Sequence, residues 1–452
     1  MAAYQNMLRA PTACPCEDSI SSNFSYFSPL PIEAAQRESV EHKVLPTNGL
    51  DIDPYEFVFE PSGDSFLHLN TLALYVKADI VTAADAPITE QKEQNVGPVN
   101  LLLNSMWSDI EVRVNDIVVN MHSSKNIAYK GIIESMLSME NNDCNFLTSS
   151  LFFLDTPGRA ESLDNDNLGH VMRVTRTRSP FDMMGPVWCD IARSDVHLAP
   201  GVKLTLRFTR APHRFVLNSP HAGAAFKLRI LDICMYARRL HISEEVSLGV
   251  LKQQKHRYLT PHTTVKDFPL PTGLKSKTIK LYSGEALPKQ VVIGFVRTSA
   301  KTGAYSENPF NFEHFNLSRI NLKLNGMRVP QEPLTPDFDN KLYAREFNHV
   351  FMNTGKFRTN TANCITYEAF GGGSTLFPFD LTPDQCNGLH LHAGRNGTLE
   401  LELEWSEPIP ADTEGITVIA YLSNNQTLVL GGKKKLGEYG EETEKAPDIS
   451  HF

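Results

Sequence analysis

The feature that most constrains how this chain can fold is a hairpin pattern that it contains twice. In the second copy, apolar and polar residues alternate over residues 320–324 with the two-residue period of a half-buried strand. Asn325 and Gly326 follow, a pair typical of a two-residue hairpin turn, because both positions of that turn need a positive φ. We expect the chain to return in register, and Pro330 and Pro333 to stop the strand pairing.

The first copy of the hairpin lies within residues 98–119. Apolar and polar residues again alternate, here over residues 110–114, and Asn115 begins the turn. Asn325 follows Asn115 by 210 residues, and the other equivalent positions of the two hairpins differ by 210 or 211. An offset that stays constant over a whole hairpin indicates duplication of a larger unit.

The order of elements after each hairpin supports the duplication. In both halves a helical stripe comes first, then a short apolar segment that ends in aspartate, then an alternating strand, and last a long apolar strand. The paired segments are 129–137 and 343–351, 151–155 and 376–380, 202–208 and 399–405, and 226–236 and 416–422. Two copies are too few for a solenoid, so each must enclose its own core, and the loop-rich β pattern favours a jelly-roll β-sandwich.

We therefore predict an all-β protein with two tandem jelly-roll β-sandwiches, a double jelly roll, and short helices in the inter-strand loops. Its predicted parts are an N-terminal arm (1–45), a first jelly roll (46–243), a second jelly roll (244–430) and a disordered C-terminal tail (431–452). Residues 239–255 contain a possible linking helix at the boundary between the two jelly rolls.

Composition narrows the classes of function. A net charge of -9 and a pI near 5.9 argue against sequence-specific nucleic-acid binding, because such a surface has to neutralise phosphates. Seven cysteines without a framework spacing predict reduced thiols in an intracellular setting. The sequence has neither a signal-peptide pattern nor an apolar window of about eighteen residues, so we expect the chain to be made in the cytosol.

The strongest candidate for a metal site is His390-Leu391-His392, because residues two apart on a strand face the same side and cupin barrels use such a pair. The glutamate that the cupin motif needs shortly afterwards is replaced by Asn396 and Gly397. We predict no metal ligands here. A cupin-like metal enzyme and a carbohydrate-binding sandwich remain the alternative functions, although Trp405 completes an apolar strand face and is expected to be core.

A glycine run and two arginine runs could suggest ligand binding, but we expect each of them to have a structural role. Gly371–Gly373 lack the lysine and the following helix of a phosphate-binding loop, so we expect a flexible loop. The run from Arg173 to Arg178 reads as an alternating arginine strand, typical of a solvated face or a subunit contact, as does Arg238-Arg239. No nucleophile elbow of the G-x-S-x-G type occurs. The prediction is a protein that is not an enzyme, without catalytic or cofactor-binding residues.

Long sequence blocks carry a resemblance to a known family. They are residues 287–338 (from LPKQVVIGFVRTSAKTGAYSENPFNFEHF to PLTPDF), 98–119 (PVNLLLNSMWSDIEVRVNDIVV), 129–138 (YKGIIESMLS), 185–191 (GPVWCDI), 226–243 (FKLRILDICMYARRLHIS) and 375–384 (TLFPFDLTPD). In this order they resemble the hexon-like major capsid proteins of Polinton or Maverick elements and adintoviruses. The resemblance covers most of residues 50–430 and does not extend to the two ends of the chain.

The resemblance implies a structural role. It implies a homotrimer whose six jelly rolls form a pseudo-hexagonal tile of an icosahedral virion shell, assembled in the cytoplasm or nucleus. Implied partners are other copies of the chain, a single jelly-roll penton protein and minor capsid proteins; contact of the arms with an internal membrane stays open. The insertions at 143–187 and 335–375 are where we expect inter-subunit clasps and an outer tower.

One local prediction concerns charge on the second hairpin. With a two-residue turn, Lys323 and Arg328 lie opposite each other on the polar face, where like charges repel. We predict an acidic partner for this pair, which could come from a neighbouring subunit.

Overall fold

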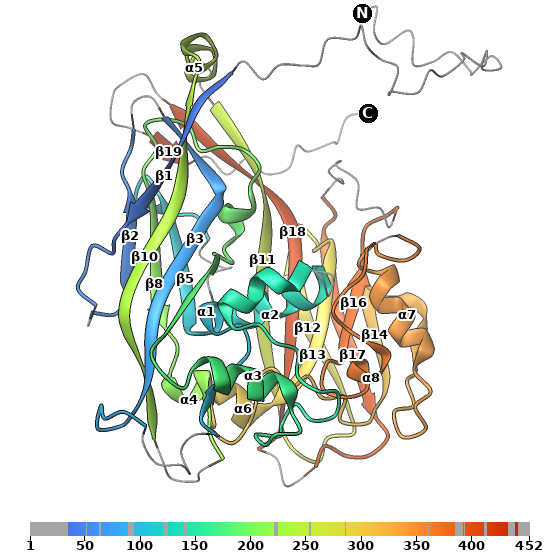
Figure 1. The fold of residues 1–452 in the computed structure, drawn as a ribbon. Coiled ribbons are helices and arrows are strands. Elements are labelled where there is room, and N and C mark those ends of the chain that lie inside the picture. Colours follow the sequence, from blue (N-terminus) through green and yellow to red (C-terminus); the bar gives the residue numbers. More distant parts are fainter. Residues whose placement is uncertain are drawn as a thin grey trace, which may run out of the picture.

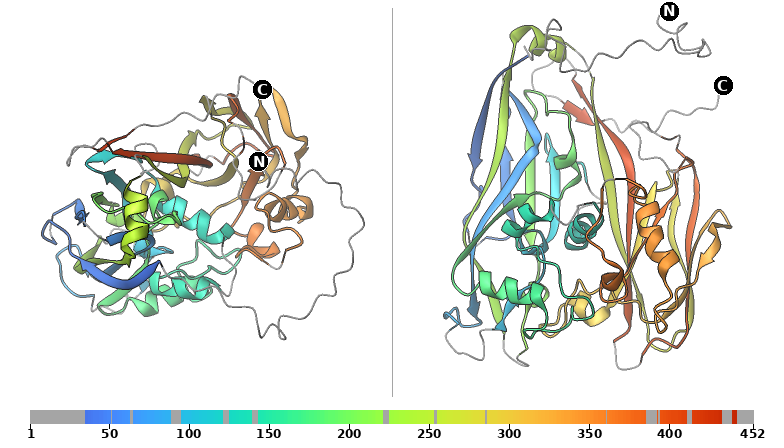
Figure 2. Two further views of the ribbon diagram at one scale, coloured as in Figure 1. Left: turned by 90° about the horizontal axis from the view of Figure 1, so that it is seen from above. Right: turned by 45° about the vertical axis from the view of Figure 1, so that its right-hand side comes forward.

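A computed structural model describes residues 35–441. Its gaps are residues 51, 63–64, 89–94, 121–124, 139–142, 221–224, 253–254, 285, 360, 385–391, 393, 411–413 and 433–438. Two β-sandwiches stand side by side with their long strands running in the same general direction, the first blue to green and the second yellow to red (Figures 1 and 2).

The first sandwich contains two four-stranded sheets, in the orders β1-β10-β3-β7 and β2-β8-β5-β6. Its strands are β1 (Gln36–Val44), β2 (Tyr55–Phe59), β3 (Ser65–Thr82), β5 (Trp107–Val114), β6 (Ile117–Val118), β7 (Phe181–Pro186), β8 (Leu204–Arg210) and β10 (Phe226–Ile242). The strands β4 (Gly97–Pro98) and β9 (Leu217–Asn218) form a separate short antiparallel pair.

The second sandwich repeats this arrangement with the sheets β11-β18-β13-β16 and β12-β17-β14-β15. Its strands are β11 (Lys255–Leu270), β12 (Ser276–Gly284), β13 (Gln290–Arg297), β14 (Leu317–Leu324), β15 (Met327–Leu334), β16 (Leu376–Asp380), β17 (Gly397–Trp405) and β18 (Ile416–Gly432), and β19 (Tyr439–Glu441) pairs with β18. If the eight strands of each sandwich are numbered in chain order, both have one sheet ordered 1-8-3-6 and one ordered 2-7-4-5. This is jelly-roll topology, so the predicted fold class is confirmed.

Helices occupy the connections. They are α1 (Leu102–Ser105), α2 (Ile127–Ser138), the 3-10 helix η3 (Asp143–Ser150), α3 (Leu168–Arg176), the 3-10 helix η4 (Asp190–Arg193), α4 (His213–Val216), α5 (Glu244–Leu251), α6 (Thr298–Thr302), α7 (Ala344–Met352) and α8 (Tyr367–Phe370). The expected helices near 129–137, 343–351 and 239–255 are confirmed as α2, α7 and α5. Helix α2 lies between the sandwiches and contacts both β5 and β11 (Figure 1).

The two cores follow from the alternation of the strands. Leu204, Leu206 and Phe208 of β8 are fully buried, and the equivalent strand β17 buries its leucines and Trp405 in the same way. Trp107 of the first sandwich packs edge-on against Phe208 with ring centroids 5.2 Å apart. Trp405 is therefore a core residue, as predicted, and burial of these apolar faces supplies most of the driving force for folding.

The second hairpin forms in the predicted register. Lys323 pairs with Arg328, and the turn residues Asn325 and Gly326 have φ values of 51° and 82°. β15 continues past both prolines to Leu334, but its pairing with β14 is interrupted between Val329 and Leu334. The expectation that the prolines stop the pairing therefore holds for residues 330–333 and is wrong for Leu334, where the pairing resumes. β15 lies at the edge of its sheet, where one side of the strand has no ladder bonds to lose, and a register shift takes up the irregularity.

The expected arms are shorter than predicted. Residues 36–44 form β1, which pairs with β10 along its whole length, so the arm interpretation is wrong for this segment. β1 has no alternating pattern for the sequence to reveal, because it lies at the edge of its sheet and all of its residues are exposed or half-buried. Residues 439–441 of the expected tail form β19. Residues 1–34 and 442–452 lie outside the described residues.

Candidate functional site

The two sandwiches pack against each other along a surface that we call the seam, and this surface contains buried charged side chains. Lys130 of α2 forms an ion pair with Oδ1 of Asp190, and the side chain of Lys130 is 1% exposed. The other carboxylate oxygen, Oδ2, accepts a hydrogen bond from the backbone N–H of Thr263 in β11 at 3.0 Å. Burial lowers the pKa of Lys130, but the nearby carboxylates of Asp190 and Glu134 outweigh this and raise it. Lys130 therefore stays charged, and its ion pair with Asp190 joins the two sandwiches.

Glu134, one turn further along α2, makes a second cross-link. Its Oε1 accepts a hydrogen bond from the hydroxyl of Tyr421 in β18 at 2.9 Å and lies 2.9 Å from Nη1 of Arg193. Burial raises the pKa of Tyr421 well above its ordinary value. Sequence reasoning missed both Lys130 and Glu134, because they look like the polar positions of a surface helix. One feature of the sequence indicates that Lys130 and Glu134 are buried: α2 carries apolar residues around nearly its whole circumference, which is typical of a helix covered on all sides.

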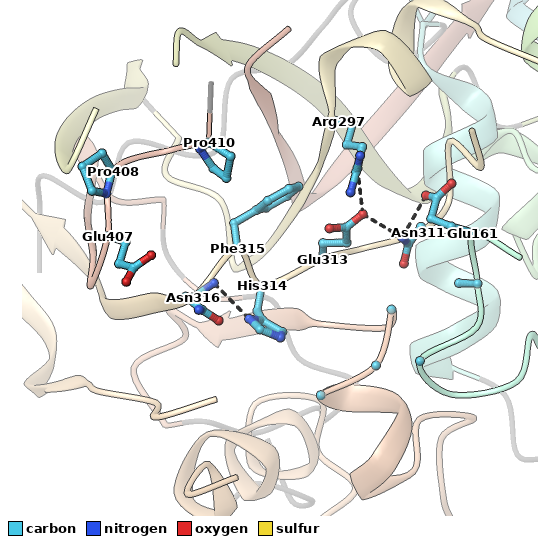
Figure 3. Close-up of a pocket in the computed structure, with 15 residues that line it drawn as sticks. Glu161, Arg297, Asn311, Glu313, His314, Phe315, Asn316, Glu407, Pro408 and Pro410 are labelled. Atoms are coloured by element: carbon cyan, nitrogen blue, oxygen red, sulfur yellow. Dashed lines mark hydrogen bonds and ion pairs between the residues drawn. The ribbon is translucent and has the colours of Figure 1, made fainter. Parts of the chain in front are cut away.

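A cavity of about 450 Å³ is lined by residues of both sandwiches (Figure 3). Its polar side chains come mainly from the second sandwich and the loops around it. The lining includes Gly158, Ala160 and Glu161 from the first sandwich, and Arg297, Asn311, Glu313, His314, Phe315, Asn316, Gly371, Gly372, Gly373, Glu407, Pro408 and Pro410 from the second. The lining is acidic, with one arginine and one histidine facing three glutamates.

Among the lining residues from the first sandwich, Glu161 is the one with a polar side chain. Its Oε2 accepts a hydrogen bond from the backbone N–H of Asn308 at 3.0 Å, and its Oε1 accepts one from Nδ2 of Asn311 at 2.8 Å. The same nitrogen donates to Glu313 at 2.9 Å, and Glu313 in turn accepts from Nε of Arg297 at 3.0 Å. Burial raises the pKa of Glu161 to about 7, against the lowering effect of its two hydrogen bonds.

Arg173 belongs to the same seam, and its position corrects a prediction. The run from Arg173 to Arg178 is not an alternating strand, because Arg173 lies in helix α3, which Asn167 caps by accepting from the N–H of His170. The guanidinium of Arg173 is buried and lies 2.8 Å from Oδ1 of Asp155. The other oxygen of Asp155 accepts from Nδ2 of Asn308 at 3.2 Å. Arg173 therefore supports the contact between the sandwiches.

The glycine run is also part of the seam. The N–H of Gly158 donates to the carbonyl of Gly372 at 2.7 Å, and the N–H of Phe312 donates to the carbonyl of Gly373 at 2.9 Å. A Cβ on Gly372 would lie 2.5 Å from the backbone nitrogen of Gly158. The expectation of a flexible loop is wrong, because these glycines allow two backbones from different sandwiches to touch.

The proposed metal pair is only partly described. His390 lies outside the described residues, and His392 is not in a strand; its Nε2 is 3.4 Å from Oδ1 of Asp384. Within the described part of the chain, no group of three or more His, Cys, Asp or Glu side chains could hold a metal ion. A further question for a chain with helices is whether any of them spans a membrane. The helices that the structure describes include none that is long and apolar enough to cross a membrane.

Among the residues that the structure describes, Cys189, Cys234 and Cys364 are buried and not in disulfides. Burial raises the pKa of the Cys189 thiol to about 11. A thiol in this state is a weak nucleophile, so Cys189 acts as a core side chain.

Comparison with known proteins gives one sequence relative and many structural ones. No family model matches the chain. The uncharacterized protein F54H12.2 of Caenorhabditis elegans is 22% identical over 401 residues, which cover 83% of this chain and 91% of that protein.

The structural likenesses extend over nearly the whole chain. A chain of the Sputnik virophage has a TM-score of 0.64 at 12% identity and covers 94% of this chain and 92% of its own length. The Faustovirus major capsid protein has a TM-score of 0.55 at 7% identity, covering 94% and 96%. The mavirus major capsid protein has a TM-score of 0.54 at 9% identity, covering 96% and 97%. At these identities the likeness concerns the fold, which is the double jelly roll that viral major capsid proteins share.

Proposed function

We propose that this chain is a major capsid protein that assembles as a homotrimer and tiles an icosahedral shell. The observation that carries the proposal is the repetition of one strand order in two sandwiches that lie side by side. Three such chains supply six equivalent sandwiches, which is the number that a pseudo-hexagonal tile needs. The likeness of the fold to viral major capsid proteins over nearly the full length supports the same reading.

The seam described above suits a tile. A tile must keep its two sandwiches at a fixed angle, and buried ion pairs such as Lys130 with Asp190 are strongly destabilised when one partner is lost. The seam also contains polar contacts from segments far apart in sequence, such as Glu161 with Asn308. We therefore assign the seam a structural role in which no group acts as a catalyst.

The subunit contacts are proposed to involve the two long insertions. Leu168 and Met172, four residues apart on the outer face of α3, are 66% and 48% exposed, and Leu342 and Met352 are exposed around α7. Exposed apolar side chains in each of the two insertions are what a protein contact surface would use. Contacts of an obligate assembly usually bury more than about 2,000 Å², so the proposed contact has to extend beyond these four side chains.

The sequence blocks support a narrower assignment, to the capsid proteins of Polinton elements and adintoviruses. We propose the virion as the location of the protein, with a single jelly-roll penton protein and minor capsid proteins as partners. The outer tower is proposed to come from one of the insertions at 143–187 and 335–375.

Native mass spectrometry of the full chain over a range of concentrations tests the assembly, and negative-stain imaging tests its shape. Trimers with a hexagonal outline are the expected result. A chain that stays monomeric at every concentration would contradict the proposal, whereas stoichiometric zinc, iron or manganese in the purified protein would favour a cupin-like enzyme instead.

A further inference from the structure

We infer that helix α7 of one copy of the chain docks on the outer face of the sheet β1-β10-β3-β7 of the next copy, so that copies join head to tail. This inference rests on the proposed trimer and names the two surfaces that form its subunit contact. The seam within each chain provides the template for the contact.

Helix α2 shows how a connecting helix covers the neighbouring sandwich. Its Glu134 accepts a hydrogen bond from Tyr421 of β18, and its Leu137 lines a small hollow at the same contact. Under this cover the sheet of the second sandwich is buried on both faces, because residues 291–296 of β13 and 416–422 of β18 are all buried. Continuous apolar runs of this kind are typical of strands without a solvent-facing side.

Helix α7 occupies the equivalent place in the second sandwich but is uncovered. Both helices lie in the connection between the fifth and sixth strands of their sandwich. Asn348 follows Glu134 by 214 residues, and Phe351 follows Leu137 by the same offset. Glu134 and Leu137 are buried, whereas Asn348 is exposed and Phe351 is half-buried. The face of α7 that matches the docking face of α2 therefore has no full cover within the described part of the chain.

The first sandwich offers the matching uncovered sheet. Its strands β3 and β10 are the equivalents of β13 and β18, yet much of their length alternates between buried and partly exposed residues. Tyr75 is half-buried, Lys77 is exposed, and Met184 of β7, which pairs with Tyr75, is 39% exposed. This face has the place of the covered face in the second sandwich but lacks its cover.

A single chain does not bring the two surfaces together. In Figure 1, β3 and β10 lie at the left of the molecule and α7 lies at its right edge, and Figure 2 shows the same separation. The cover for each surface therefore has to come from another copy. Because the two surfaces differ, the contact is heterologous, and three copies that each give one α7 and accept one close a ring of six sandwiches.

The charges of the two surfaces are complementary. On the sheet, Asp182 and Asp232 are the cross-strand neighbours of Lys77, so this row carries one excess negative charge. On α7, the exposed Arg345 donates to two backbone carbonyls and has no carboxylate partner among the residues that the structure describes. A contact between chains that fold separately is expected to be more polar than the permanent seam, and opposite charges then favour the correct pairing.

Native mass spectrometry of two complementary variants of the full chain tests the contact. Ala344→Glu with Asn348→Glu adds charge to the α7 face, and Lys77→Glu with Met184→Glu adds charge to the sheet face. All four positions are exposed, so both variants should fold, which circular dichroism checks. Each variant alone should form the trimer at least about tenfold less tightly than the wild type.

A mixture of the two variants should form a one-to-one heterodimer. The unchanged sheet of the α7 variant can still accept the unchanged α7 of the sheet variant, but the two altered faces that remain cannot close the ring. Variants that stay trimeric like the wild type, or that fold but form no heterodimer, would overturn the inference and leave the proposed trimer standing. A wild-type chain that stays monomeric would overturn the proposed function and this contact with it.

Amine crosslinking of the wild type gives a second readout that needs no substitution. Trimers assembled from isotopically light and heavy chains should give crosslinks between Lys77 and Lys341, which lies just before α7. These crosslinks should join light to heavy peptides, because the two lysines meet between copies. Trimers without such mixed crosslinks would also overturn the inference.

Discussion

Nζ of Lys323 lies 2.6 Å from Oε1 of Glu402, on the adjacent strand β17 of the same sheet. Nε of Arg328 lies 3.7 Å from the other oxygen, Oε2, of the same carboxylate. The acidic partner predicted for this pair of cations is therefore present, and it belongs to the same chain. One carboxylate bridges two like charges that face each other across the hairpin.

Glu402→Gln should destabilise the second sandwich by about 1 kcal/mol, because it removes the carboxylate that bridges the opposed cations Lys323 and Arg328. Urea unfolding of the purified chain measures the change. The hydrogen bond from Lys323 lowers the pKa of Glu402 below 4.5, so the contribution is present above pH 4.5 and is lost as the pH falls through the lowered value.

The matched control for this prediction is Glu404→Gln on the same strand. Glu404 lies 4.0 Å from Arg319 and its side chain is 52% exposed, so its loss should cost less than about 0.5 kcal/mol. Equal effects of the two substitutions would contradict the bridging role of Glu402.

Both hairpins could be predicted because their signals are local. In each hairpin the alternation of apolar residues and a two-residue turn, Asn115-Asp116 or Asn325-Gly326, fix the register within a dozen residues. Lys323 opposite Arg328 follows from that register alone. Glu402 could not be predicted as the partner, because it comes from a strand about 80 residues away whose neighbours depend on the whole topology. The same applies to Glu161 and Asn308 at the seam.

Asp190→Asn should cost about 3 to 5 kcal/mol of stability, because it leaves the ammonium group of Lys130 buried without a counter-charge. Thermal and urea unfolding would show the loss. Replacing both residues, as in Lys130→Met with Asp190→Leu, should recover much of the lost stability, since a buried ion pair can often be replaced by apolar groups at little cost.

Asp182→Asn, at an exposed position of β7, is the control and should change stability by less than about 0.5 kcal/mol. A double variant as unstable as the single one would show that the charge is not the cause.

Gly372→Ala should destabilise the chain by about 1 to 3 kcal/mol, because the new methyl group would lie 2.5 Å from the backbone of Gly158 across the seam. Gly249→Ala in helix α5 is the matched control. Nothing lies within 4 Å of its new Cβ, and alanine favours the helix, so this variant should be as stable as the wild type or up to about 1 kcal/mol more stable. Melting temperatures of the two variants compare the sites, and an unaffected Gly372→Ala would mean that the seam can yield locally.

The arginine run shows why a local pattern can mislead. Arginines at every second position suggest a strand, yet Asn167 caps a helix there, and the buried positions His170, Arg173 and Val174 follow helical spacing. The capping residue was the signal that could have corrected the reading. The burial of Arg173 could not be seen in advance, because its partner Asp155 and the carbonyls of Pro98 and Phe153 are brought together only by the fold.

Met172→Asp should weaken the proposed trimer at least about tenfold while leaving the fold of the single chain intact. Met172 is 48% exposed beside Leu168 on the outer face of α3, so a charge there costs little in the monomer but would be desolvated in a subunit contact.

Met327→Asp is the control, because Met327 is 71% exposed at the tip of the second hairpin, outside the two long insertions in sequence. Native mass spectrometry over a concentration series measures the trimer fraction of each variant, and circular dichroism checks the fold. Equal trimer fractions for Met172→Asp and wild type would remove α3 from the contact surface, and a loss with Met327→Asp instead would move that surface to the hairpin tip.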